Sequence, residues 1–277
     1  MIDSGVAWIV VECAFGDEDF RLPDWMAPIR VRTKSVLWPK ERLLNLAIRR
    51  LPARCTKVAW LDADVSFENV DWMTETSAVL ETCNVVQPFD VAVRLPRGAC
   101  VDDGTGVRWE SFASVMLREP DAIAVGSFGA HGHTGFAWAA RRDIVERHGL
   151  YDCCVAGRGD HLIAHGLGGD WESACIDRIT GGGAEHRAHA VAWCERIYED
   201  VRARIGCVRG TLLHQWHGDV AARRYQDSLS WLGAQSFDPA ADLCENDDGV
   251  WEWRRDGESR SAWMRDYFRR RDIVLEE

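Results

Sequence analysis

Three short motifs of this sequence contain side chains that can hold metal ions or move protons. Asp62 and Asp64 flank one alanine after an apolar run, and His214 and His217 follow another such run. Asp160 comes directly after the Gly-Arg-Gly segment 157–159. Carboxylates bind hard divalent cations, and imidazoles bind manganese-like or zinc-like ions. A carboxylate held beside a substrate hydroxyl can also serve as a general base.

Each motif also has a purely structural interpretation. An Asp-x-Asp pair is common by chance and can form a turn that caps the next helix. The two histidines can be partly buried and bonded to backbone, and Asp160 can be a helix N-cap. Composition at these positions alone does not separate the structural from the chemical interpretation.

Two further histidine pairs compete with 214 and 217 as site residues. His131 and His133 lie in a glycine-rich segment and remain candidates. His186 and His189 fall in a polar stretch with helical character, and we expect them to be solvated.

The elements predicted around these motifs place them at the ends of strands. The apolar runs 7–11 and 57–61 predict buried strands, the second of which leads into Asp62. Apolar spacing predicts a helix over 39–51, and further segments predict a helix over 71–83 and a strand over 84–87. Alternating strands and helices indicate an α/β fold with a mostly parallel central sheet flanked by helices, in which ligands bind beyond the carboxyl ends of the strands.

The second half of the chain is predicted to continue this pattern less regularly. The expected elements are a strand over 136–140, a helix over 141–148, a glycine-rich loop over 157–169, a helix over 185–205, a strand over 207–213 and a helix over 220–232. We predict one domain over residues 1–235 and an irregular or helical, aromatic and basic extension over 236–277.

Composition excludes several classes of protein. The 277 residues are 47% hydrophobic and 28% charged, as in an ordinary globular chain. No apolar run reaches the length of about 18 residues that a membrane span needs, and the N-terminus does not resemble a signal peptide. We therefore expect a cytoplasmic protein whose ten cysteines are reduced. The 14 tryptophans suit stacking on sugar rings or bases, and they equally suit core packing.

The net charge of −11 disfavours nonspecific binding to nucleic acid or to anionic membranes, but the charge is uneven. Residues 30–57 contain one acid, Glu41, and many basic residues, including Lys40 and Arg42. This stretch predicts a local anion site, with a solvated helix face as the alternative. Arg223, just after the late histidines, is a further candidate for contact with a phosphate.

Taken in order, these features resemble the nucleotide-sugar glycosyltransferases of the GT-A fold. The matching features are an N-terminal strand, a basic helix with Asn45, a strand ending in Asp-x-Asp, the segment Gly135–Arg142 followed by Gly149-Leu-Tyr-Asp152, a glycine-flanked Asp160 and a late histidine. The first half is similar to inverting bacterial transferases, and the second half to animal beta-galactosyltransferases. Gly159 stands where the latter have a glutamate before the base, and His214 stands where they have methionine.

The resemblance implies a hexosyltransferase that uses a nucleoside-diphosphate sugar, with UDP as the expected nucleotide, and Mn²⁺ or Mg²⁺. Asp64, His217 and His214 would be metal ligands, and Asp62 would reach the ribose or a metal-bound water. Lys40, Arg42, Asn45 and Arg223 would contact the donor. Asp160 would deprotonate an acceptor hydroxyl that attacks with inversion.

The acceptor is left open by the sequence, as are two other classes of function. It could be a glycan, or a hydroxymethylated base in DNA, because residues 251–272 mix arginine with aromatic residues as nucleic-acid grooves do. The same composition suits a helix that packs back on the domain. A histidine-carboxylate metal hydrolase and a noncatalytic sugar- or nucleic-acid-binding module are the alternatives to a transferase.

Overall fold

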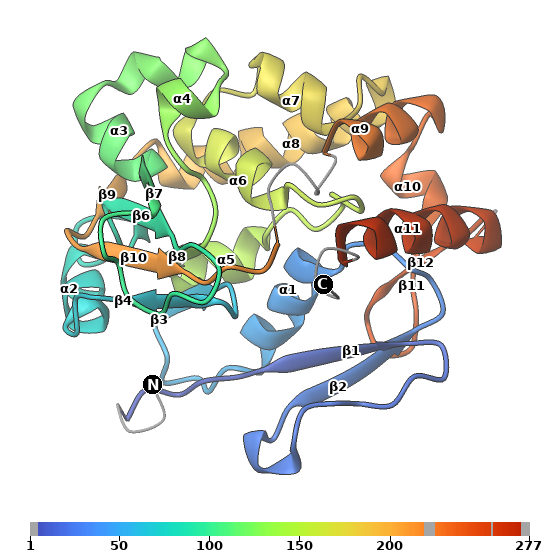
Figure 1. Ribbon diagram of the computed structural model, residues 1–277. Coiled ribbons are helices and arrows are strands. Elements are labelled where there is room, and N and C mark those ends of the chain that lie inside the picture. The colour runs from blue at the N-terminus through green and yellow to red at the C-terminus, as the bar shows by residue number, and fades with distance from the viewer. Residues whose placement is uncertain (1–4, 219–224, 256, 273–277) are drawn as a thin grey trace.

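The structure, a computed structural model, describes residues 5–218, 225–255 and 257–272. The chain begins with two parallel strands, β1 (Val11–Phe15) and β2 (Ile29–Thr33), followed by helix α1 (Lys40–Arg50) (Figure 1). A short 3-10 turn, η2 (Asp24–Met26), lies between the two strands. The helix forms where the sequence predicts it. The predicted first strand, 7–11, is placed too early, because residues 11–15 are the ones that pair with β2.

A mixed four-stranded sheet carries the Asp62 and Asp64 motif at the end of one strand. Its strands, in spatial order, are β3 (Lys57–Leu61), β8 (Ala137–Arg141), β5 (Val85–Gln87) and β9 (Ile205–Cys207). β8 runs antiparallel to both of its neighbours, and β5 and β9 are parallel. The α/β class is therefore confirmed, but the prediction of a mostly parallel sheet is wrong. A strand buried on both faces has the same continuous apolar sequence in either direction, so its direction cannot be inferred from that sequence.

A second four-stranded sheet carries the late histidines. It consists of β4 (Val65–Phe67), β10 (Thr211–His214), β6 (Val91–Arg94) and β7 (Val107–Glu110), in that order. β10 is antiparallel to β4 and parallel to β6. The single strand predicted over 207–213 is thus two strands in two sheets. The chain turns between them at Gly210, whose φ of +143° favours glycine.

Helices pack around these sheets, and most of them lie above the sheets in the view of Figure 1. They are α2 (Trp72–Val79), α3 (Phe112–Arg118), the 3-10 helix η3 (Pro120–Val125), α4 (Phe128–His131), α5 (Arg142–His148), α6 (Gly159–Gly168), α7 (Ala174–Ile179) and α8 (Ala184–Val201). The sequence predicts a loop where α6 lies, because glycine disfavours helices. Tertiary packing overrides that preference: a Cβ at Gly166 would lie only 2.8 Å from the Trp193 ring of α8.

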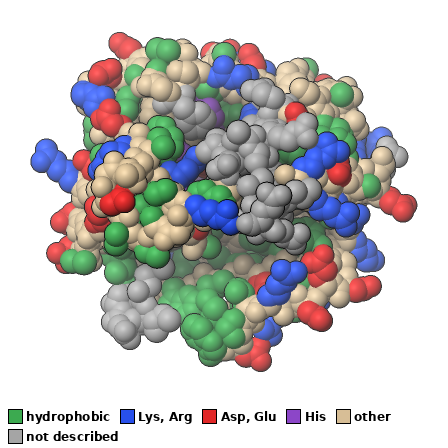
Figure 2. All heavy atoms as spheres, viewed as in Figure 1, with side chains coloured by type: hydrophobic (Ala, Val, Ile, Leu, Met, Phe, Trp, Pro, Cys, Tyr) green, Lys and Arg blue, Asp and Glu red, His purple; other side chains and the backbone are tan. Residues whose placement is uncertain are grey.

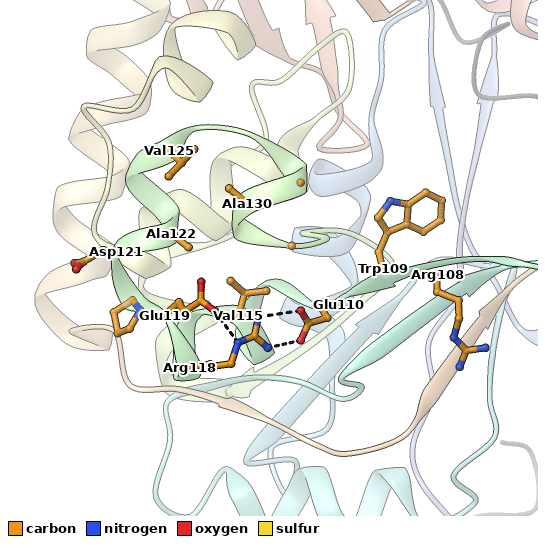
Figure 3. Close-up of a pocket in the computed structure, with 13 residues that line it drawn as sticks. Arg108, Trp109, Glu110, Val115, Arg118, Glu119, Asp121, Ala122, Val125 and Ala130 are labelled. Atoms are coloured by element: carbon orange, nitrogen blue, oxygen red, sulfur yellow. Dashed lines mark hydrogen bonds and ion pairs between the residues drawn. The ribbon is translucent and has the colours of Figure 1, made fainter.

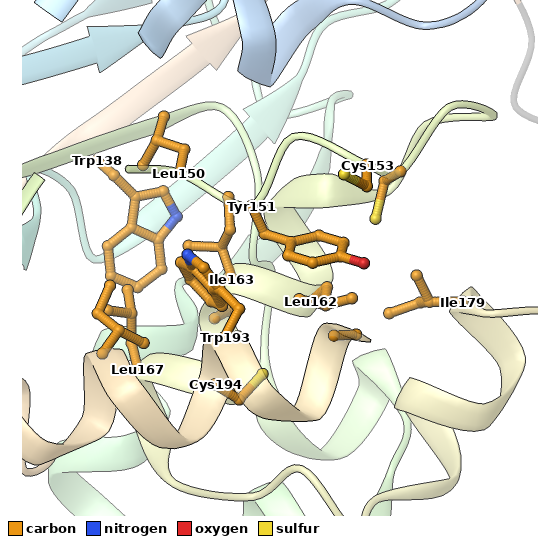
Figure 4. Close-up of a cluster of buried hydrophobic side chains, with 14 of the residues drawn as sticks. Trp138, Leu150, Tyr151, Cys153, Leu162, Ile163, Leu167, Ile179, Trp193 and Cys194 are labelled. Carbon is orange, nitrogen blue, oxygen red and sulfur yellow. The ribbon is translucent and has the colours of Figure 1, made fainter. Parts of the chain in front are cut away.

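The main hydrophobic core lies between the β3-β8-β5-β9 sheet, α6 and α8. Figure 4 shows Trp138 of β8 and Leu167 of α6 on one side of Trp193 of α8, and Tyr151 on its other side. Trp138 is 1% exposed, and its indole N–H donates to the Thr134 carbonyl oxygen at 2.7 Å. The core contacts hold α6 against α8 and the sheet.

The described residues of the C-terminal part form helices and one hairpin. It contains α9 (Tyr225–Ala234), α10 (Pro239–Asp242), the hairpin of β11 (Leu243–Glu245) and β12 (Trp251–Trp253), and α11 (Gly257–Asp272). Met264 and Tyr267 of α11 are buried against Val36 and Ala156. The aromatic residues of α11 therefore pack back on the rest of the chain. None of the described helices combines the length and apolar composition that crossing a bilayer requires.

Candidate metal and substrate site

The ends of β3 and β10 bring the Asp-x-Asp and the His-x-x-His motifs together. Asp64 lies immediately before β4, and β4 pairs with β10 so that Val65 stands opposite His214. The Gln215 N–H donates to the Asp64 carbonyl oxygen at 2.8 Å and extends this pairing by one residue. Residues that are far apart in the chain therefore lie side by side because of strand register.

Asp64, His214 and His217 form a compact three-residue cluster. The Asp64 Oδ2 atom lies 3.4 Å from His214 Nε2 and 3.1 Å from His217 Nε2, and the two Nε2 atoms are 3.2 Å apart. His214 is buried and lies near Phe136, with ring centroids 4.7 Å apart, whereas His217 is exposed. Two imidazoles and one carboxylate on one side of an ion leave room for ligands from a substrate.

The ionisation of Asp64 suits this role. Burial opposes its ionisation, but the hydrogen bond and charge of His214 and the charge of His217 outweigh burial and hold the pKa of Asp64 below its usual value. The carboxylate is therefore available as a negatively charged ligand at neutral pH.

Lys40, Asp62 and Asp160 form a charged group beside this cluster. The Lys40 ammonium, at the first residue of α1, forms an ion pair with the Asp62 carboxylate. Burial lowers the pKa of Lys40, but the nearby carboxylates of Asp62, Asp160 and Glu41 outweigh it, so the net shift is upward. Lys40 therefore stays positively charged. A bound anion could compete with Asp62 for its ammonium group.

Asp160 has the electrostatic properties of a general base. Burial raises the pKa of its carboxyl above the usual value, the charge of Lys40 opposes that rise, and the charge of Asp62 adds to it. Its backbone geometry is fixed by Arg158, whose positive φ of 73° turns the chain into α6. A raised pKa makes a carboxylate a stronger proton acceptor.

Two glycines make room for the acidic groups of this site. A Cβ at Gly135 would lie 2.4 Å from Asp160 Oδ2, so the Asp160 carboxylate rests directly on the backbone of residue 135. A Cβ at Gly159 would lie 2.4 Å from the carboxyl carbon of Glu41. Glu41 thus fills the space beside Asp160 that a side chain at residue 159 would occupy. Burial raises the pKa of Glu41 to about 8.

Arg42 and Asn45, which we expect to contact the donor, have partners within the fold. Arg42 is 4% exposed, forms ion pairs with Asp152 and Glu245, and lies over the Trp251 ring at 4.2 Å. Asn45 is buried, and its amide donates to the Leu150 carbonyl oxygen at 2.9 Å and accepts from the Leu150 N–H at 2.8 Å. These contacts already occupy the polar groups through which Arg42 and Asn45 would bind a substrate. Arg223 lies outside the described residues.

The other histidines differ from expectation in two ways. His186 is not solvated: it is fully buried between Tyr151 and Phe237, and burial lowers its pKa to about 3. His131 does not act with His133 but belongs to a second buried group with His161, His165 and Cys175. The sequence contained a signal for this group, since His161 and His165 are spaced to share a helix face.

Figure 2 shows the face of the molecule seen in Figure 1, on which basic and acidic side chains are interspersed. A separate pocket lies between β7, α3, η3 and α4 (Figure 3). Arg118 closes one side of it through hydrogen bonds to Glu110. The residues that line this pocket include neither the three-residue cluster nor the charged group beside it.

Comparison with known proteins found no matching family model, no matching curated protein and no matching solved structure. The geometry of the site is therefore the basis on which a function can be assigned.

Proposed function

We propose that the chain is a metal-dependent glycosyltransferase that transfers a hexose from a nucleoside-diphosphate sugar, with UDP as the expected nucleotide, to an acceptor hydroxyl. The observation that carries the proposal is the convergence of Asp64, His214 and His217 next to the Lys40–Asp62 pair and Asp160. A cation site, a fixed ammonium and a base with a raised pKa are what diphosphate displacement by a hydroxyl needs. The order of motifs along the chain, which is similar to that of GT-A transferases, supports the same assignment.

In this proposal Asp64, His214 and His217 hold Mn²⁺ or Mg²⁺, which would neutralise charge on the departing diphosphate. Lys40 contributes a second positive charge to the diphosphate, and Asp62 orients Lys40 and the ribose. Asp160 accepts the proton of the acceptor hydroxyl as its oxygen attacks the anomeric carbon from the face opposite the leaving group. The new bond forms with inversion, and the nucleoside diphosphate leaves.

Two variants separate the roles of binding and catalysis. Asp160→Asn keeps the size of the side chain but removes the base, so we expect kcat to fall about 10²–10⁴-fold while donor binding is nearly unchanged. Asp64→Ala should abolish metal-dependent binding of the donor. Titration calorimetry with UDP and Mn²⁺ measures binding, and Asp143→Ala is a matched control, since Asp143 is an exposed acid paired with Arg141. Equal loss of binding and turnover in Asp160→Asn would contradict its role as the base.

An acceptor screen tests the reaction class. It should contain soluble glycans, lipid-linked sugars, proteins and hydroxymethylated DNA. The DNA arm is included because Arg265 and Arg269 of α11 are exposed next to its packed aromatic face. A hydrolase would release sugar from the donor at the same rate with and without any acceptor. A binding module would bind the donor without turnover.

All ten cysteines are free thiols in the structure. This supports a cytoplasmic location, in which donor sugars of this class and reduced thiols coexist.

A further inference from the structure

A second group of metal-ligating side chains is enclosed between α4, α6 and α7. His131 is the last residue of α4, His161 and His165 lie one turn apart on α6, and Cys175 lies in the first turn of α7. His131, His165 and Cys175 are fully buried, and His161 is 7% exposed. The group is separate from Asp64 and its two histidines, and the proposed transfer reaction does not use it.

Three of the six separations among the four ligand atoms match a tetrahedral site, and all four atoms lie within 4.8 Å of one another. His161 Nε2 lies 3.2 Å from the Nε2 atoms of both His131 and His165, and Cys175 Sγ lies 3.8 Å from His131 Nε2. Zinc–nitrogen bonds of about 2.05 Å and a zinc–sulfur bond of about 2.3 Å at tetrahedral angles give nitrogen–nitrogen separations of about 3.3 Å and nitrogen–sulfur separations of about 3.6 Å. The distances here differ from these values by only about 0.2 Å.

The hydrogen bonds on the outer side of the rings determine where the lone pairs point. His131 Nδ1 lies 3.0 Å from the Gly132 carbonyl oxygen, and His165 Nδ1 lies 3.2 Å from the Asp170 carbonyl oxygen. A carbonyl oxygen only accepts, so both Nδ1 atoms carry the hydrogen, and the neutral rings present lone pairs at Nε2.

Both of these lone pairs point at His161 Nε2. That atom carries at most one hydrogen and can donate it to one of the two, while the Cys175 sulfur lies 3.8 Å from His131 Nε2, within hydrogen-bonding distance. A cation at the centre satisfies all three nitrogens at once.

The Cys175 sulfur lies beside a cation. The Arg178 guanidinium donates to Cys175 Sγ at 3.1 Å, and it also donates to the Gly126 carbonyl oxygen. The Asp170 carboxylate lies 3.7 Å from His165 Nδ1, in the position of an outer carboxylate that orients a ligating imidazole. Three imidazoles and a thiolate select a borderline-soft ion rather than Mg²⁺ or Ca²⁺.

We propose that His131, His161, His165 and Cys175 bind one zinc ion in a closed structural site. The ion ties α4, α6 and α7 together. The ion also anchors the first turn of α6 through His161. Asp160, the proposed base, directly precedes His161 in that turn.

Cobalt substitution tests the proposal on the intact protein. The full chain is unfolded, freed of metal with a chelator, and refolded under reducing conditions with Co²⁺. We expect about one tightly held cobalt per chain with a tetrahedral visible spectrum and a sulfur-to-cobalt charge-transfer band in the near ultraviolet. The Asp64 cluster has no sulfur ligand and cannot produce that band, so Asp64→Ala should keep it. A refolded wild-type chain without the band would overturn the proposal.

Variants and native metal content complete the test. Cys175→Ser should lose the charge-transfer band, whereas Cys194→Ser, a control at an equally buried cysteine of α8, should retain it. The wild-type protein purified from zinc-containing medium should hold about one zinc per chain after dialysis against a mild chelator. Stripping it should lower the melting temperature by about 10 °C or more. A band that persists in Cys175→Ser, or a melting temperature indifferent to zinc, would refute the site even if the transferase assignment holds.

Discussion

Glu41 is a carboxylic acid enclosed within the candidate site, and its replacement by glutamine has a stability effect whose size depends on pH. The residue is 4% exposed and lies against the backbone of Gly159, near Lys40 and Asp160. Burial raises its pKa from the ordinary 4.5 to about 8, although the charge of Lys40 opposes the rise. The folded protein therefore keeps the Glu41 proton at pH values where the unfolded chain has lost it.

The magnitude follows from the two pKa values. Below pH 4.5 both states are protonated, and the carboxyl of Glu41 is nearly equivalent to the neutral amide that replaces it. Between about pH 4.5 and pH 8 the folded state binds more protons than the unfolded state, so the stability of the wild type falls as pH rises. At about 1.36 kcal/mol for each pH unit of that interval, the loss reaches at most about 5 kcal/mol. Water entry and local relaxation reduce this loss of stability, and we expect a loss of about 2–4 kcal/mol.

The assay is urea unfolding of wild type and Glu41→Gln at several pH values from about 4.5 to about 8.5. We expect similar stabilities at the acidic end of this range and a growing advantage for the variant toward pH 8. Asp160 shifts stability in the same direction in both proteins, so their difference isolates Glu41. Glu195→Gln, at an exposed position of α8, controls for the loss of one acid. A difference between wild type and Glu41→Gln that does not change with pH would refute the enclosure of a neutral carboxyl at this position.

Three further predictions concern neighbouring parts of the structure. Gly135→Ala places a Cβ 2.4 Å from Asp160 Oδ2, so the Asp160 carboxylate, the proposed base, must shift. We expect kcat to fall about 10²-fold while Mn²⁺ binding, measured by calorimetry, is retained. Asn45→Ala leaves the buried N–H and carbonyl of Leu150 without their partner and should cost about 2–3 kcal/mol in urea unfolding, whereas a direct donor contact would instead raise KM with little loss of stability. Met264→Ala removes a fully buried side chain of α11 and should cost about 2–5 kcal/mol; a cost near zero would mean that α11 does not pack on Val36 and Ala156.

The sequence predicted the local elements more successfully than their spatial arrangement. Helix α1 is confirmed because apolar spacing and Pro39 are local signals, and β3 is confirmed because it is a short apolar run. The direction of β8 and the split between β9 and β10 depend on partners far away in the chain. The sequence of a strand that is buried on both faces does not indicate which strands pair with it or in which direction.

The same limit explains which site residues could be predicted. Asp64, His214 and His217 were identified because they stand at the ends of apolar runs, and strand register then brings them together. Arg42 has the composition of a phosphate ligand, yet its charge is satisfied by Asp152 and Glu245, which a reading of single residues cannot detect. The arginine illustrates that charge type predicts affinity for anions but not which anion.

Helix α6 links the two groups of chemically active side chains. Asp160 and His161 are consecutive, so the first turn of α6 directs one residue toward Lys40 and Asp62 and the next toward His131 and His165. Glycine at 159 makes this turn compatible with the Glu41 carboxyl, and glycine at 166 lets the same helix pack closely on α8. A helix with glycine at both places has weak intrinsic stability. Tertiary contacts must therefore hold α6 in place. A metal centre on one face of α6 would fix the orientation of Asp160, the proposed base, on the adjoining face.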